Sequence, residues 1–130
     1  MGEISSQDLY SFDLDNEKNV FYVKVSGYIK EEDAKIYLSE FQTIVNTINP
    51  CKFTLIVDGR GQEEVPSHVV DDISFVLNLY WMAGFKMLII VLPTSPTSRE
   101  QVEVCAEKIN FRGLFVNSVG EAFNIHKAIK

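Results

Sequence analysis

The stretch Lys52–Gly61, KFTLIVDGRG, restricts the fold of this chain more than any other. Residues Phe53 to Val57 are all apolar or β-branched, and the run stops at Asp58. A short apolar run that ends on Asp and Gly is typical of a strand buried on both faces, as in a parallel sheet covered by crossover helices. Residues 58–61 are therefore predicted to lie at the carboxyl end of a central strand, where open α/β sheets place ligand and contact sites.

Hydrophobic periodicity along the rest of the chain predicts the order β-β-α-β-α-β-α-β-α. The expected strands cover residues 9–14, 20–26, 53–57, 85–92 and 114–116, and the first two helices cover 31–49 and 67–83. The third and fourth helices are expected to begin at Ser98 and Ser118, because Gln101 and Glu121 follow at the spacing of capping boxes.

This order predicts a single α/β domain over residues 1–130, with residues 1–8 as a flexible lead-in. The first two strands form a hairpin across a polar turn, and the later strands alternate with helices, which implies right-handed crossovers. The expected sheet is five-stranded and mostly parallel with an antiparallel edge strand, and the helices cover mainly one face.

Charge and apolar content exclude several classes of partner. The net charge is −6 and the pI is about 4.8, which argues against binding to nucleic-acid phosphates or to anionic membrane surfaces. No apolar stretch reaches a membrane-spanning length, so we expect a cytoplasmic protein without membrane insertion. Basic or neutral partners remain open.

Cysteine and histidine, two of the residue types that bind zinc, are sparse and scattered. The two cysteines, Cys51 and Cys105, are too far apart in sequence for a metal quartet or a disulfide framework, and both are expected to be buried thiols. His68 is expected to be a solvated residue at a helix start, and His126 a packed or snorkelling side chain. The sequence predicts neither a metal site nor a cofactor.

The polar segment after the central strand contains two side chains with more than one interpretation. Asp58 is favoured as a structural acceptor for the amides of Arg60 and Gly61 over a general base, because no His or Cys follows nearby to complete a catalytic set. Arg60, between Gly59 and Gly61, could bind an anion or be a solvated loop cation.

The helix at 67–83 has more apolar residues than one buried face needs. One stripe consists of Val69, Ile73, Val76, Leu77 and Tyr80, and a second one consists of Phe75, Leu79 and Met82. Trp81 and Tyr80 are expected in the core or at its edge. The second stripe is either buried by the sheet and a neighbouring helix, or it marks contact with another chain, for example in a homodimer.

Three segments carry a resemblance to a known family. They are VDGRG (57–61), AGFKMLIIV (83–91) and RGLFVNSVGEAF (112–123). With the order of elements, they resemble the STAS family, the anti-sigma factor antagonist domain, which has an Asp-Ser-Ser-Gly-like turn, a Gly before a hydrophobic strand, and a short strand before a final helix. The similarity extends from about Tyr10 onward.

The resemblance implies a β-α superhelix that binds a partner protein, often a kinase-type anti-sigma factor, with serine phosphorylation as the release switch. Asp58 and Gly61 match the family turn, whereas its two serine positions are occupied by Gly59 and Arg60. Without a hydroxyl in the turn, phosphorylation there is not expected, and Arg60 places a positive charge where the family would introduce a negative one.

The resulting hypothesis is a non-enzymatic, cytoplasmic, STAS-like regulatory domain that works by protein contact. Its contact surface would combine residues 58–61, the helix that follows, and the loop that begins with Thr94 and Ser95. The alternative is a binding module for a small apolar, lipid-like or anionic ligand, which a pocket over the sheet lined by Phe75, Leu79 or Met82 would indicate. An enzyme has least support, because no nucleophile with a base, metal ligand set or cofactor fingerprint can be found.

Overall fold

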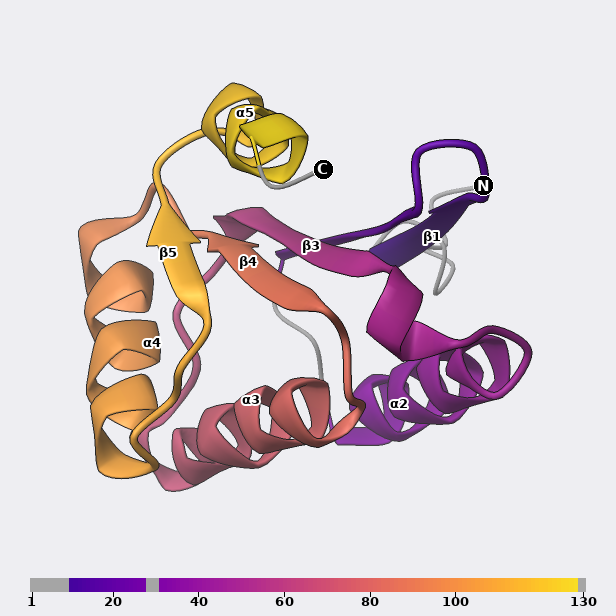
Figure 1. The fold of residues 1–130 in the computed structure, drawn as a ribbon. Helices are drawn as coiled ribbons and strands as arrows, with labels where there is room; N and C mark the ends of the chain where they lie inside the picture. The colour runs from indigo at the N-terminus through magenta and orange to yellow at the C-terminus, as the bar shows by residue number, and fades with distance from the viewer. Residues whose placement is uncertain (1–9, 28–30, 129–130) are drawn as a thin grey trace, which may run out of the picture.

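Five strands form one sheet in the order β1-β2-β3-β4-β5 (Figure 1). The computed structural model describes residues 10–27 and 31–128. The strands are β1 (Tyr10–Asp15), β2 (Val20–Gly27), β3 (Thr54–Gln62), β4 (Met87–Val91) and β5 (Leu114–Val116). The helices are α2 (Glu31–Val45), α3 (Asp71–Met82), α4 (Pro96–Lys108) and α5 (Val119–Ala128), with short 3-10 turns at Pro50–Lys52 and Ser67–Val69. The predicted order of elements is confirmed, and the lead-in proposed for residues 1–8 lies outside the described residues.

The pairing of the strands confirms the predicted topology. β1 pairs with β2 antiparallel, and β2, β3, β4 and β5 pair in parallel. Each crossover places the next strand beside the previous one, so β3 lies at the centre of the sheet. Between Lys24 and Ser26 the pairing advances two residues in β2 but three in β3, from Asp58 to Gly61. This β-bulge lies in the segment that the sequence singled out.

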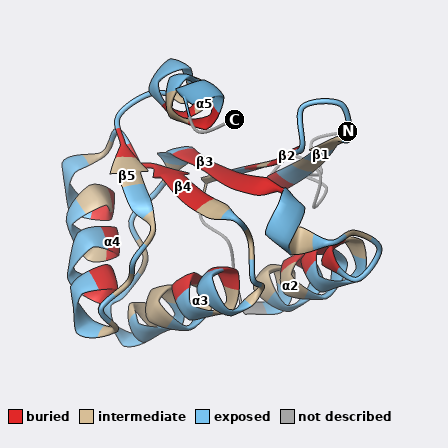
Figure 2. Ribbon diagram, viewed as in Figure 1, coloured by how far each residue is buried: buried red, intermediate tan, exposed pale blue. Residues whose placement is uncertain are grey.

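The helices form two layers around the sheet, because α2, α3 and α4 cover one face and α5 covers the other (Figure 1). The larger core lies under the three helices and includes Phe21, Leu55 and Tyr80, whereas Ile56, Ile89 and Ala122 pack under α5. Buried residues are concentrated along β3 and β4 and on the inner sides of the helices (Figure 2). The long apolar run at 53–57 is thus explained, since β3 is covered on both faces.

Several local boundaries differ from the sequence predictions for identifiable reasons. α4 begins at Pro96, where the fixed φ of proline suits the first helical position, and Ser95 is the N-cap. The Ser98–Gln101 capping box is therefore wrong, and Gln101 bonds instead to the amide and carbonyl of Val65 at 3.0 and 2.8 Å. In α5, Ser118 accepts the amide of Glu121 at 3.1 Å, as predicted.

The two cysteines differ in environment. Cys105 is fully buried, as expected, and Cys51 is exposed, so the prediction of a buried thiol at position 51 is wrong. Cys51 lies in the 3-10 turn Pro50–Lys52, which precedes β3 and lies outside the sheet. No helix among the described residues is long and apolar enough to cross a membrane.

Candidate functional site

Residues 58–61 lie within β3 and not in a loop after it, which corrects the predicted end of the strand at Val57. The neighbouring strand β2 continues to Gly27 and supplies backbone partners, because Lys24 pairs with Asp58 and Ser26 pairs with Gly61. A strand continues where a neighbour offers its ladder of donors and acceptors, even when its own residues are poor strand formers.

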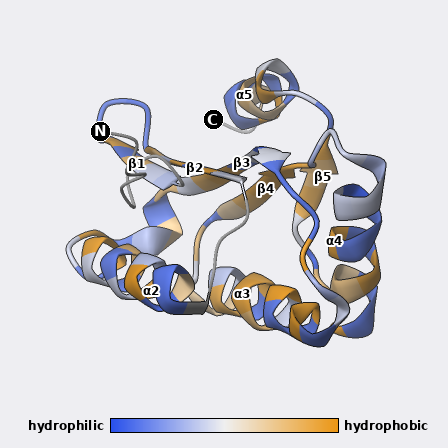
Figure 3. Ribbon diagram, turned by 180° about the vertical axis from the view of Figure 1, so that it is seen from behind, coloured by the Kyte–Doolittle hydropathy of each residue, from blue (hydrophilic) through white to orange (hydrophobic). Residues whose placement is uncertain are grey.

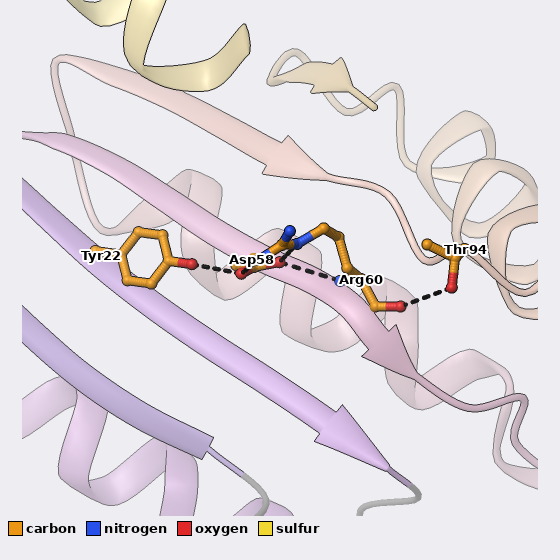
Figure 4. Close-up of polar contacts among 4 residues, drawn as sticks. All are labelled: Tyr22, Asp58, Arg60 and Thr94. Atoms are coloured by element: carbon orange, nitrogen blue, oxygen red, sulfur yellow. Dashed lines mark hydrogen bonds and ion pairs between the residues drawn. The ribbon is translucent and has the colours of Figure 1, made fainter. Parts of the chain in front are cut away.

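The carboxylate of Asp58 is the centre of the site and is 1% exposed. It accepts a short hydrogen bond from the hydroxyl of Tyr22 on β2 (Figure 4). It also accepts the Arg60 amide at 3.2 Å and, at 2.9 Å each, the Nε and Nη2 groups of the same side chain. No bond to the Gly61 amide is found. Asp58 therefore joins β2 to the bulged end of β3.

The surroundings of Asp58 favour its ionised form. Burial by itself would raise the pKa of Asp58, but hydrogen bonds from Arg60 and Tyr22 outweigh it and hold the pKa below its usual value. Burial and the hydrogen bond to Asp58 raise the pKa of Tyr22 to about 12. An ionised carboxylate with a lowered pKa and four donors is a poor general base, so this geometry supports the structural interpretation of Asp58.

Arg60 is neither a free anion site nor a fully solvated cation. Its side chain is 47% exposed, and its guanidinium is directed back along the strand onto Asp58. Thr94, which follows β4, donates its amide and its hydroxyl to the Arg60 carbonyl at 3.2 and 3.1 Å (Figure 4). Ser95 accepts the Ser98 amide at 3.4 Å as the cap of α4. The structure thus brings Asp58, Arg60 and Thr94 together at the carboxyl end of β3, in a cluster that we call the polar edge.

The two glycines of the site are in close contact with neighbouring strands. A Cβ at Gly59 would lie 3.1 Å from the Val91 carbonyl oxygen of β4, and a Cβ at Gly61 would lie 2.9 Å from the Cβ of Ser26 on β2. A side chain at either position would press against backbone or against an atom fixed to it. Strands β2, β3 and β4 therefore pack too closely at the bulge to accommodate a side chain at either glycine.

Replacing Gly61 with Ala should lower the free energy of unfolding by roughly 1–3 kcal/mol, the usual cost of overpacking. The added methyl group would meet the Ser26 Cβ at 2.9 Å and force β2 away from β3. Gly120→Ala is the matched control, because the nearest atom to a Cβ there is the Ser118 hydroxyl oxygen at 4.0 Å. Urea unfolding of both variants is the measurement. Equal stability of the two would show that β2 and β3 are not in tight contact at the bulge.

The second apolar stripe of the helix at 67–83 is divided between a groove and open solvent. Phe75 and Met82 are 59% and 71% exposed, and Leu79 is half-buried. Leu79 and Met82 both line a groove beside the C-terminal end of α2, and Phe75 lies outside that lining. In Figure 3, α3 is more continuously apolar than α2 or α4. The expectation of a core position is correct for Tyr80 and wrong for Trp81, which is 48% exposed on the flank of the helix.

A cavity of about 130 Å³ lies on the opposite, sheet-facing side of α3. Its lining includes Ile73 and Val76 of α3 and Gly59 of β3, but none of the residues Phe75, Leu79 and Met82 that the sequence predicted for a pocket. Tyr37 of α2 and Tyr80 of α3 also line it and form a short hydrogen bond between their hydroxyls. Sequence analysis missed this pair, because Tyr37 and Tyr80 belong to the apolar stripes of two different helices. The periodicity of each helix does not show which residues of the two helices are in contact.

The two histidines lie apart from the polar edge. Among the described residues, no group of three His, Cys, Asp or Glu side chains could hold a metal ion. His68 is exposed, and His126 is buried, with its ring nitrogens 2.9 Å from the Thr54 hydroxyl and 2.9 Å from the Lys18 carbonyl oxygen. His126 therefore attaches α5 to β3 and to the β1–β2 turn.

Comparison with known proteins finds similarity in the fold alone. No family model matches this sequence, and no curated protein matches it. A solved structure, an uncharacterized protein of the DUF3478 family from Shewanella loihica PV-4 with a SpoIIAA-like fold, superposes with a TM-score of 0.61 at 14% identity. The match covers 88% of this chain and 91% of that one. This chain therefore has the SpoIIAA-like fold, which is the fold of the STAS anti-sigma factor antagonists that its sequence resembles.

Proposed function

We propose that this chain is a non-enzymatic regulatory domain that works by protein contact, and that its partner at the outer face of α3 is a second copy of itself. The observation that carries the proposal is the exposure of Phe75 and Met82, at 59% and 71%, on a helix whose other stripe packs against the core. We call these two residues, with Asn78 between them, the α3 ridge. Large apolar side chains grouped on one face of a helix indicate a contact surface.

The spacing of the α3 ridge suits a two-fold interface. Phe75 and Met82 are two helical turns apart, so antiparallel packing of two α3 helices would place each Phe75 against the Met82 of the other copy, with the axis near Asn78. The first turn of α3 contains Asp71 and Asp72, and the last turn contains no acidic residue. Antiparallel packing therefore keeps the acidic turns apart, whereas parallel packing would bring them together.

The size of the ridge predicts a weak dimer. Burying a Phe or Met side chain completely contributes about 1.5–3 kcal/mol, so the four apolar ridge side chains of a dimer would contribute roughly 6–12 kcal/mol at most. Association itself costs about 4–15 kcal/mol. The balance is compatible with dissociation in the micromolar range or above, which suits a regulatory contact more than a permanent one.

The polar edge at Asp58, Arg60 and Thr94 supports a contact that phosphorylation of the turn does not switch. Positions 59 and 60 carry no hydroxyl, and the Arg60 guanidinium is already held by Asp58. We propose a cytoplasmic location, where Cys51 and Cys105 would remain thiols.

Charge substitutions on the α3 ridge test the proposal. We expect Met82→Glu and Phe75→Glu each to give a folded monomer by light scattering, with an unchanged circular dichroism spectrum, because both side chains are largely outside the core. In the antiparallel arrangement each new carboxylate would lie against the apolar ridge residue of the other copy, and the cost of removing its hydration would oppose association. Both positions are more exposed than the half-buried Leu79, so they separate association from folding better. Phe75 also lies outside the lining of the α2–α3 groove, which Leu79 and Met82 share.

Val104→Glu is the matched control, since Val104 is a 43%-exposed apolar residue on α4 and lies outside the ridge. It should associate like the parent protein. If Val104→Glu dissociates the dimer as strongly as Met82→Glu does, the contact is not at α3. If both ridge variants associate like the parent, the partner of the ridge is not a second copy.

A further inference from the structure

The cavity behind α3 is separate from the α3 ridge and has a chemistry of its own. It has a volume of about 130 Å³ and lies between α2, α3 and the sheet. Most of its lining is aliphatic, with Val25, Val57 and Ile90 contributed by three neighbouring strands. Fully apolar cavities of similar size, about 150 Å³, stay dry and admit molecules such as benzene. The volume therefore fits a ligand of roughly six to eight non-hydrogen atoms.

Two tyrosines in the lining of the cavity supply phenolic hydroxyl groups. Tyr37 and Tyr80 are 3% and 4% exposed, and their hydroxyls are hydrogen-bonded to each other. Such a pair contains two hydroxyl hydrogens, and only one of them is used in the mutual bond. The second hydrogen remains for an acceptor that enters the cavity. Burial raises the pKa of both groups, so both stay protonated at neutral pH.

The charged and polar groups of the lining exclude an anion. None of the described residues that line the cavity is basic, and Asp72 is the one charged side chain among them. A carboxylate or phosphate group would lose its hydration without gaining a counter-charge, and it would be repelled by Asp72. Gln62 is the remaining polar side chain of the lining, and it is neutral.

We propose that the cavity binds a small neutral molecule with an apolar body and one oxygen acceptor, such as a ketone, and that the Tyr37–Tyr80 hydroxyl pair donates to that oxygen. The sequence left open a small ligand that is either apolar or anionic. The cavity favours the apolar, uncharged ligand. The site does not depend on self-association, because the cavity and the ridge lie on opposite sides of α3. A protein that proves monomeric would still bind the ligand.

Cyclohexanone is the test probe, since it has seven non-hydrogen atoms including one carbonyl oxygen. A titration followed by ¹H–¹⁵N NMR should shift the amide signals of Ile73, Val76 and Gly59, which line the cavity. The double variant Tyr37→Phe/Tyr80→Phe should bind cyclohexanone about three- to tenfold more weakly, the usual effect of one lost hydrogen bond. It should bind methylcyclohexane, which has no acceptor, as the parent does. Removing both partners of a buried hydrogen bond while keeping their shape costs little stability, so the variant should fold.

Tyr10→Phe is the matched control. Tyr10 is also buried, and its hydroxyl donates to Glu40 at 3.0 Å, outside the described cavity lining. It should bind cyclohexanone like the parent. Ala34→Leu, at a half-buried position in the lining, should fill the space and abolish the shifts.

Four results would overturn the proposal. The first is the absence of saturable shifts in the parent at millimolar cyclohexanone. The second is equal weakening of binding by Tyr10→Phe and by the double variant. The third is tighter binding of cyclohexanecarboxylate than of cyclohexanone, since an anion would then be the preferred ligand. The fourth is unchanged binding in Ala34→Leu.

Discussion

Replacement of Ile56 by Asp is expected to abolish the cooperative unfolding transition at room temperature. Ile56 is 0% exposed at the centre of β3 and pairs with Ile89 of β4, which is also 0% exposed. An isolated carboxylate there would have no counter-charge, and its burial costs several kcal/mol or forces the group to take up a proton. That cost is a large part of the roughly 5–15 kcal/mol that stabilises a domain of ordinary size.

Thermal melting followed by circular dichroism checks this expectation, and Ile89→Asp should behave in the same way. Ser11→Asp is the matched control, because Ser11 is exposed on β1 and pairs with Lys24. It should melt close to the parent. An Ile56→Asp variant that keeps the parent's melting temperature would show that β3 is not central to the core.

Replacement of Asp58 by Ala should lower the free energy of unfolding by about 2–4 kcal/mol at neutral pH. The change leaves the Tyr22 hydroxyl without its acceptor and releases the Arg60 guanidinium. Buried polar groups that lose a charged partner carry a cost of this order. Asp58→Asn keeps the shape and one acceptor oxygen, so its loss should be smaller. Urea unfolding at pH 7 measures both.

The lowered pKa of Asp58 predicts how this contribution depends on pH. A carboxyl whose pKa is lower in the folded state stabilises the fold above its unfolded pKa, which is about 3.9 for Asp. The contribution is lost as the pH falls through the folded-state pKa. The parent should therefore lose more stability than Asp58→Asn between pH 5 and the acid limit of the measurement. Parallel stability curves for the two proteins below pH 4 would contradict the role of Asp58 as a buried ionic acceptor.

The sequence identified β3 correctly as a central strand, but it placed the end of the strand too early. Phe53–Val57 is recognisable because an unbroken apolar run needs cover on both faces. The continuation through Gly61 depends on pairing with β2, whose register no local pattern shows. The contact of Asp58 with Arg60 is local and was within reach of sequence analysis. The contact with Tyr22 joins residues 36 positions apart and depends on the same register.

Helical periodicity separated the two stripes of α3 correctly, and what covers each stripe could not be predicted. The stripe with the partly buried Ile73 and the buried Tyr80 packs against the core, as its size suggested. Whether Phe75 and Met82 would be covered depended on where α2 and α4 lie, which is set by packing over the whole sheet. The cavity was missed for a related reason, because a void forms where facing side chains fail to fill the space and no single segment encodes it.

Sedimentation equilibrium of the unmodified chain is the most direct test of self-association through the α3 ridge. We expect the weight-average mass to rise from the monomer value of 14.8 kDa toward twice that value as the concentration increases through the micromolar range. The same experiment on Met82→Glu should give the monomer mass throughout. A parent protein that stays at 14.8 kDa up to high micromolar concentration would contradict the proposal that a second copy covers the ridge.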